Sequence, residues 1–212
     1  MRKLQILVYI IVVLILITVY TFAFVDHPLD TIAGWFMREP YYDGKSIGYW
    51  AAQLRDGNSE ARFRALMALQ KAGPKARSAI PAIAEFMEQN CDDVSQDGMT
   101  RFYAARLILE TFGPEARVAI PTLKRTYQNA RTPYVWTYMI ETLIRIDEVD
   151  TERFLVNELS SESWQLRERA AHKLNDHPTM ARRAVDALRR AATDLHPEVR
   201  RAAESALRSI SQ

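Results

Sequence analysis

The first residues with a spacing suited to chemistry form an acidic stretch typical of calcium-binding loops. Asp93, Ser95, Asp97 and Gly98 occupy positions one, three, five and six of such a loop. The twelfth position, which should supply a bidentate glutamate, is Ala104. We therefore interpret this stretch as an inserted polar loop and expect no bound metal.

Histidines near the C-terminus raise the question of a zinc site. His172 and His177 are five residues apart, with Asp176 between them, whereas a zinc-binding pair on a helix has a spacing of four. Pro178 also interrupts the helix at this point. Because His196 falls at a predicted helix start, we expect hydrogen-bonded or solvated histidines rather than metal ligands.

Motifs of catalysis are absent from the sequence. It contains no nucleophile elbow, phosphate-binding loop, dinucleotide fingerprint or HExxH pair. Carboxylates are plentiful, but no pair stands out from ordinary use on helix surfaces. These observations favour a non-enzymatic protein that carries no cofactor.

Basic residues in the C-terminal part form a candidate binding surface. From residue 163 onward, ten Lys and Arg residues stand against six Asp and Glu residues. Four arginines are predicted on the outward face of one helix: Arg182, Arg183, Arg189 and Arg190. Such a patch could bind a phosphate-bearing or acidic partner, and the alternative is a solvated helix surface. Residues 131–162 are acidic, so the two regions could also pair internally.

A dense aromatic set precedes the basic region. Tyr134 and Tyr138 lie one helical turn apart, with Trp136 between them. Packing in the core is the default for such residues. If Trp136 is partly exposed, it becomes a candidate hot spot for binding a protein.

These residues must be positioned by helices. The chain has 212 residues, only seven glycines, 48% hydrophobic residues and a formal charge of +2, which favours a helical domain without a strong electrostatic field. From residue 45 onward the apolar spacing is helical, and no stretch alternates with period two. The lone Cys91 cannot form an internal disulfide.

The N-terminal segment predicts a membrane anchor. Residues 4–25 carry no charge, and a helix of that length spans about 33 Å, enough for a bilayer core. Arg2 and Lys3 precede it, so the N-terminus is expected in the cytoplasm and the rest of the chain across the membrane. The alternative is a cleaved signal peptide, although the apolar run is longer than is usual for one. We assign residues 1–25 to the anchor and residues 26–44 to an irregular stalk.

A repeated phrase predicts a repeated structural unit. GPKARSAIP begins at Gly73-Pro74 and GPEARVAIP begins at Gly113-Pro114, 40 residues later, and seven of their nine positions match. The glycine suits the backbone that ends a helix, and the proline prevents the helix from continuing. Each phrase is therefore predicted to separate the two helices of a pair.

Leucines set the register of five repeats, with separations of 40, 34, 31 and 33 residues: Leu69, Leu109, Leu143, Leu174 and Leu207. Mostly small residues lie one turn before them and let a neighbouring helix approach: Ala65, Ala105, Met139, Ala170 and Ala203. The predicted N-caps of the same helices are Asn58, Gly98, Thr132, Ser163 and His196. Pro133 and Pro197 follow two of these caps, at a position where the missing N–H costs nothing.

The pattern resembles the HEAT-repeat family. The likeness rests on SSESWQLRERAAHKL (160–174), DLHPEVRRAAESAL (194–207) and the two Gly-Pro turns. It covers residues 45–212 and implies a short right-handed α-solenoid, in which stacked helix pairs share one core. In this family an arginine after the valine forms a ladder near the repeat junctions, and the matching residues are Arg62, Arg167 and Arg200. Phe102 and Trp136 occupy the same position in the second and third repeats, so the ladder is interrupted.

The segment GKSIGYW (44–50) is similar to the opening of membrane-anchored bacterial HEAT proteins. This resemblance implies a scaffold on the periplasmic side of the inner membrane that holds a protein partner on a concave surface lined by second helices. Two alternatives remain open. The basic C-terminal helices could bind nucleic acid, which a domain across the membrane would not meet, or the chain could be a bilin-lyase-like enzyme, for which no pigment-binding residue set is present.

Overall fold

The computed structural model describes residues 40–210. The predicted anchor at residues 4–25 and most of the predicted stalk lie outside the described residues. No helix within residues 40–210 is both long and apolar enough to cross a bilayer. The chain divides into two compact units, residues 1–79 and residues 80–212, and each is described by itself.

The first unit begins with a two-stranded hairpin, β1 (Tyr41–Tyr42) and β2 (Lys45–Ser46). Its turn has positive φ at Asp43 (52°) and Gly44 (71°). Positive φ at both central residues is typical of two-residue hairpin turns, whose twist matches that of the flanking strands. The prediction of an irregular stalk up to residue 44 is therefore wrong for residues 41–44. The sequence also predicted helix from about residue 45, whereas the first helix begins at Ile47.

Segment 44–50 has a structural role in this unit. Ser46 caps α3 (Ile47–Asp56) by accepting a hydrogen bond from the Tyr49 amide at 3.1 Å. The indole Nε1 of Trp50 donates to the Tyr42 carbonyl at 3.0 Å. The serine and the tryptophan thus join the hairpin to the first helix.

The next helix, α4 (Ser59–Ala72), follows the predicted pattern. The Asn58 side chain accepts a hydrogen bond from the Ala61 amide at 2.9 Å, which confirms Asn58 as the N-cap. Ala65 and Leu69 are fully buried. Gly73 ends the helix with φ of 57°, and no atom lies near the position of a Cβ there, so the backbone angle rather than space favours glycine.

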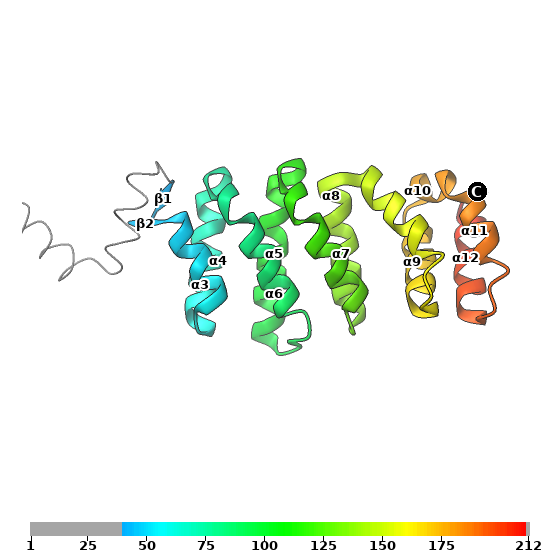
Figure 1. Ribbon diagram of the computed structural model, residues 1–212, viewed down its shortest axis with the longest axis horizontal. Helices are drawn as coiled ribbons and strands as arrows, with labels where there is room; N and C mark the ends of the chain where they lie inside the picture. Colours follow the sequence, from blue (N-terminus) through cyan, green and yellow to red (C-terminus); the bar gives the residue numbers. More distant parts are fainter. Residues whose placement is uncertain (1–39, 211–212) are drawn as a thin grey trace, which may run out of the picture. The chain divides into compact units, whose positions relative to one another are not determined.

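The second unit has eight α-helices among its described residues, and in Figure 1 they follow one another in sequence order. The helices are α5 (Ile80–Gln89), α6 (Gln96–Phe112), α7 (Ile120–Asn129), α8 (Pro133–Glu158), α9 (Trp164–Asp176), α10 (Pro178–Arg183), α11 (Val185–Ala191) and α12 (Pro197–Ser209). In one layer α6 packs on α8, α8 on α9 and α9 on α12. In the other layer α5 packs on α7. The two layers contact each other where α7 packs on α8 and α11 packs on α12.

Both Gly-Pro phrases fold as 3₁₀ helices, which the sequence pattern did not predict. They are η1 (Gly73–Ala79) in the first unit and η2 (Gly113–Ala119) in the second. Gly113 has φ of 52°, close to the value at Gly73. Two alanines of η2, Ala116 and Ala119, are buried. The phrase therefore recurs because it supplies both a helix end and a buried tight turn.

The third repeat reaches its second helix without a Gly-Pro phrase. Asp147 has non-helical angles (φ −158°, ψ 96°) inside α8 and separates that helix into two parts. Its Oδ1 accepts a hydrogen bond from the Asp150 amide at 3.1 Å, as an N-cap does. Its Oδ2 accepts one from Arg117 Nε at 3.0 Å. In the third repeat, Asp147 alone thus separates the two helices, which the Gly-Pro phrase separates in the first two repeats.

The N-cap of α6 was predicted wrongly. Ser95, not Gly98, caps this helix, and its Oγ accepts a hydrogen bond from the Gly98 amide at 3.0 Å. Asp93 Oδ1 accepts from Ser95 Oγ at 2.6 Å. The calcium-like spacing is therefore part of a helix start. The other three predicted caps, Thr132, Ser163 and His196, lie at N-cap positions without a side-chain capping bond.

The leucine register agrees with the observed core. Within the second unit, three of its leucines are fully buried: Leu109, Leu143 and Leu174. So are the residues one turn before the register leucines: Ala105, Met139, Ala170 and Ala203. Leu207, in the last helix of the described chain, is only partly buried.

Candidate partner-binding cleft

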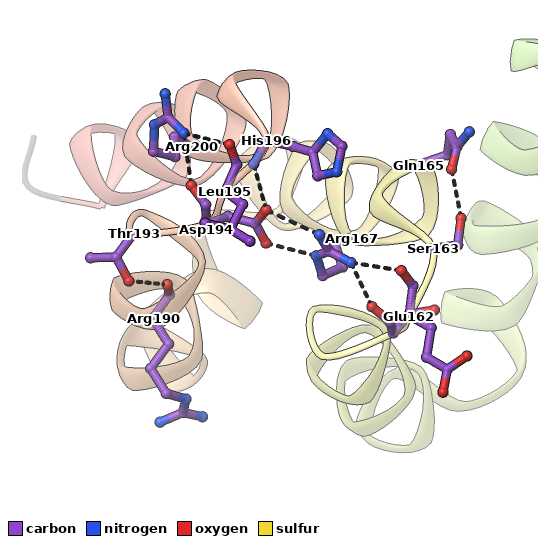
Figure 2. A network of polar contacts seen from close by, with 11 residues as sticks. Glu162, Ser163, Gln165, Arg167, Arg190, Thr193, Asp194, Leu195, His196 and Arg200 are labelled. Carbon is purple, nitrogen blue, oxygen red and sulfur yellow. Dashed lines mark hydrogen bonds and ion pairs between the residues drawn. The ribbon is translucent and has the colours of Figure 1, made fainter.

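The ladder arginines bind the turns that precede their own helices. In the first unit, Arg62 Nη2 donates to the Arg55 carbonyl at 3.1 Å. In the second unit, Arg167 Nη1 donates to the carbonyls of Ser161 at 2.8 Å and Glu162 at 3.0 Å (Figure 2). These bonds supply donors to backbone carbonyls near the start of the next helix.

Arg200 of α12 makes the same kind of contact with the turn before its helix. Both Arg200 and Arg167 bind Asp194, the first through its carbonyl and the second through its carboxylate. Arg200 Nη1 donates to the carbonyls of Asp194 at 2.8 Å and Leu195 at 2.9 Å. The Asp194 carboxylate receives Arg167 Nε at 2.7 Å and Nη2 at 3.0 Å, and it accepts the His196 amide at 2.8 Å. The hydrogen bond and ion pair from Arg167 hold the pKa of Asp194 below its usual value. Figure 2 shows this junction between α9 and α12.

The two residues that interrupt the ladder differ in exposure. Phe102 is fully buried and meets the Tyr134 ring edge-on, with ring centroids 6.2 Å apart. Trp136 is only partly buried. Partial exposure was the condition for regarding Trp136 as a candidate hot spot, so its surroundings decide its role.

The junction between α8 and α9 lacks both members of the pair seen between α9 and α12. Trp136 stands at the position of Arg167, and Ser161 stands where Asp194 does, two residues before the N-cap of the next helix. A cleft of about 460 Å³ lies at this junction. It is lined by Arg131, Pro133, Trp136, Thr137, Gln165, Glu168, Arg169, His172, Lys173 and Asp176.

Two cations from α9 lie against Trp136. The Arg169 guanidinium carbon is 5.8 Å from the ring centroid and Lys173 Nζ is 5.7 Å from it, both within the range of cation–π attraction. Arg169 and Lys173 are four residues apart and share one helix face. That spacing was the only sequence signal for the cleft beyond Trp136, and it was not recognised.

Lys173 is the buried part of the cleft, with only 4% of its surface exposed. Its Nζ lies 2.7 Å from Asp176 Oδ2 and 3.9 Å from Glu141 Oε1. His177 Nε2 lies 3.3 Å from the same Glu141 oxygen. This lysine is therefore held by carboxylates of its own chain, as a buried charge must be. The histidines considered as zinc ligands have separate partners: His177 contacts Glu141, whereas His196 stacks on Trp164.

The four arginines of the predicted basic patch do not share one helix. Arg182 and Arg183 end α10, Arg189 and Arg190 end α11, and Ala184 separates the two short helices with φ of −97° and ψ of 8°. The prediction of a single helix face is therefore wrong, although all four side chains are exposed.

Half of these arginines are paired within the chain. Arg183 Nη2 lies 2.9 Å from Glu148 Oε1, and its Nε contacts Glu152. Arg189 lies 3.4 Å from Asp186. Among the described residues, Arg182 and Arg190 have no ion-pair partner. The acidic third repeat thus neutralises part of the basic region, as internal pairing predicts.

A second cavity, of about 570 Å³, lies beside the Asp147 break and is lined by Arg117, Ile120, Pro121, Asp147, Val149, Asp150 and Arg153. Its charges are largely matched, since Arg117 pairs with Asp147 at 3.0 Å and Lys124 pairs with Asp150 at 2.7 Å. We therefore regard the Trp136 cleft as the stronger candidate site.

No protein-family model and no curated protein matches the chain. Among solved structures, one from work on TOG–tubulin binding specificity in microtubule dynamics and mitotic spindle formation is similar, with a TM-score of 0.54 and 12% identity over 78% of this chain and 76% of that one. A designed armadillo repeat protein in complex with the peptide (KR)4 has a TM-score of 0.39 and 16% identity, over 76% and 80% of the two chains. The first likeness, with the helix pairing described above, shows an all-α helical-repeat solenoid fold.

Proposed function

We propose that this chain is a non-enzymatic HEAT-like scaffold that binds a protein partner through the Trp136 cleft. The observation that carries the proposal is the partly exposed Trp136 in a cleft between two repeats, flanked by the cations of Arg169 and Lys173. Tryptophan and arginine are among the residues that most often dominate protein–protein binding.

The fold supports a binding function in general terms. Helical-repeat proteins present extended surfaces to their partners, and the similar solved structure concerns binding of tubulin by a TOG protein. The partner was expected on a concave surface of second helices. The cleft lies instead between α8 and α9, in the layer of first helices, and we place the docking surface there.

The proposal includes membrane anchoring through residues 4–25, with the N-terminus in the cytoplasm and the repeats on the periplasmic side of a bacterial inner membrane. It rests on the uncharged run and the two basic residues that precede it. Nucleic acid is the second candidate partner, because Arg182 and Arg190 are exposed and have no ion pair within residues 40–210. The internal pairing of Arg183 and Arg189 weakens that candidate.

A topology reporter tests the anchoring. A phosphatase that is active only outside the cytoplasm, fused after Gln212, is expected to be active, whereas a reporter that fluoresces only in the cytoplasm is expected to stay dark. The opposite pair of results would place the repeats in the cytoplasm. It would contradict the anchoring proposal and make salt-dependent binding of DNA by Arg182 and Arg190 the next test.

The variant Trp136→Ala tests the docking surface. A random peptide library is selected on the full-length chain in neutral detergent, and the selected peptides are then titrated against the variant. Loss of a hot-spot tryptophan typically costs 2 kcal/mol or more, so affinity is expected to fall by at least about tenfold.

Tyr103→Ala is the matched control, because Tyr103 is an aromatic residue of a first helix with 44% of its surface exposed and lies outside the cleft. Binding through the cleft should survive this change. Peptides that bind the Trp136→Ala variant as tightly as the unmodified chain would show that the cleft is not the docking surface.

A further inference from the structure

We propose that the ligand of the Trp136 cleft is an acidic, extended peptide segment that places one apolar side chain against Trp136 and carboxylates on Arg169 and Arg131. This inference rests on the proposed function and specifies the chemistry of the partner. The chemistry of the partner depends on which charges of the cleft are already paired within the chain.

The carboxylates of the cleft already have polar neighbours within the chain. Asp176 is 2.7 Å from Lys173 Nζ. Glu168 Oε1 lies 3.8 Å from His172 Nε2, one helical turn away. A basic ligand would therefore have to share Asp176, half of whose side chain is exposed, with Lys173, which already pairs with it at 2.7 Å.

Two arginines of the cleft, by contrast, are available to a ligand. Arg169 contacts the Trp136 ring, and no ion pair engages it among residues 40–210. Arg131 approaches Asp92 only to 4.0 Å, and 85% of its side chain is exposed. A stacked guanidinium still presents its N–H groups in one plane, which suits a carboxylate that accepts two parallel hydrogen bonds.

The next junction of the same unit shows what the cleft lacks. Between α9 and α12, the Asp194 carboxylate accepts two hydrogen bonds from Arg167. Between α8 and α9, the corresponding residue is Ser161, and the chain supplies no acid there. A ligand carboxylate can instead pair with Arg169, which lines the cleft one helical turn from Lys173.

The aromatic residue argues against a nucleic-acid ligand. A nucleobase binds tryptophan by stacking on the face of the ring. Arg169 and Lys173 both lie over the Trp136 ring, within 6 Å of its centroid, so a base that stacks where they lie would have to displace them. An aliphatic side chain needs only contact with the ring edge and fits the cleft of about 460 Å³.

Three dye-labelled peptides of equal length test the inference by fluorescence anisotropy on the full-length chain. Each carries one central leucine and is flanked by glutamate, glutamine or lysine. We expect only the glutamate peptide to bind at moderate salt, and its affinity should fall as salt rises. Arg169→Gln is expected to weaken it at least about tenfold, and Arg131→Gln by less, because Arg131 is more exposed.

Matched controls separate the cleft from general basic charge. Arg182→Gln and Arg190→Gln remove exposed, unpaired arginines outside the cleft and should leave the affinity unchanged. Arg169→Lys keeps the charge but loses the planar donor pair, so partial binding is expected. Because Arg169 forms no ion pair within the described chain and loses only the contact with the Trp136 ring, its variants should melt only slightly below the unmodified protein.

Each other outcome overturns a defined part of the proposal. Equal affinity for the glutamate and glutamine peptides, or no effect of Arg169→Gln, would overturn the acidic ligand. Library peptides that need Trp136 but are neutral or basic would overturn it while leaving the proposed function intact. An oligonucleotide that displaces the glutamate peptide and needs Arg169 would reassign the cleft to nucleic acid. If no peptide of any composition depends on Trp136, both proposals fail.

Discussion

The variant Phe102→Ala is expected to lose about 3–5 kcal/mol of unfolding free energy, the usual cost of truncating a buried phenylalanine. Phe102 is fully buried in α6 and its ring meets that of Tyr134 on α8. Truncation removes this contact and leaves a cavity between two neighbouring helices that cannot close completely. Urea denaturation followed by far-ultraviolet circular dichroism measures the loss.

Phe102→Leu is the control for this prediction, because it keeps an apolar side chain of similar volume and should cost less than about 1.5 kcal/mol. Phe102→Arg tests whether this repeat tolerates the arginine that other repeats carry at the ladder position. We expect strong destabilisation, because the guanidinium would enter a fully buried site. An unfolding free energy for Phe102→Ala within about 0.5 kcal/mol of the unmodified chain would mean that Phe102 is not a core residue.

The variant Asp194→Ala should cost about 2–3 kcal/mol at neutral pH, since hydrogen bonds to charged groups are worth more than neutral ones and the partner is left unpaired. The side chains of Arg167 and Asp194 are only 15% and 11% exposed. The variant removes both hydrogen bonds from Arg167 and the bond from the His196 amide. Chemical denaturation at neutral pH checks the magnitude, and Asp194→Asn keeps the shape while removing the charge.

The cost of Asp194→Ala should depend on pH in a defined direction. Arg167 lowers the pKa of Asp194 in the folded chain, so the ionised carboxylate stabilises the fold. This stabilisation is complete above the ordinary aspartate pKa of about 4 and is lost as the pH falls through the lower folded value. The stabilities of the two proteins should therefore converge in acid. A difference that stays constant down to strongly acidic pH would contradict the role assigned to the ion pair.

Much of the repeat pattern could be predicted because it is local. Burial at Leu109 and Leu143 follows from helical periodicity, and the N-cap at Asn58 follows from residue type and position. The predicted N-cap of α6 was wrong because two nearby residues are both suitable caps. Ser95 and Gly98 are both acceptable N-caps by type, and the structure uses Ser95, which lies three residues earlier.

Other features depend on side chains that meet across helices. The break at Asp147 uses Arg117, which lies 30 residues away in the sequence. Arg183 belonged to a candidate basic surface, with internal pairing as the alternative, and it pairs with Glu148 and Glu152 of α8. Neither pairing has a signal within one helical turn, so spacing in the sequence cannot reveal it.

The sequence by itself determined the all-α repeat organisation, because periodic burial and helix-ending residues are properties of short stretches of chain. It also identified Trp136 as the residue to examine. Only the tertiary structure decided that Trp136 is partly exposed in a cleft, while Phe102, at the same repeat position, is fully buried. The physical reason is that exposure depends on which side chains a neighbouring helix supplies. Arg169 and Lys173 reach Trp136 only because α9 packs beside α8.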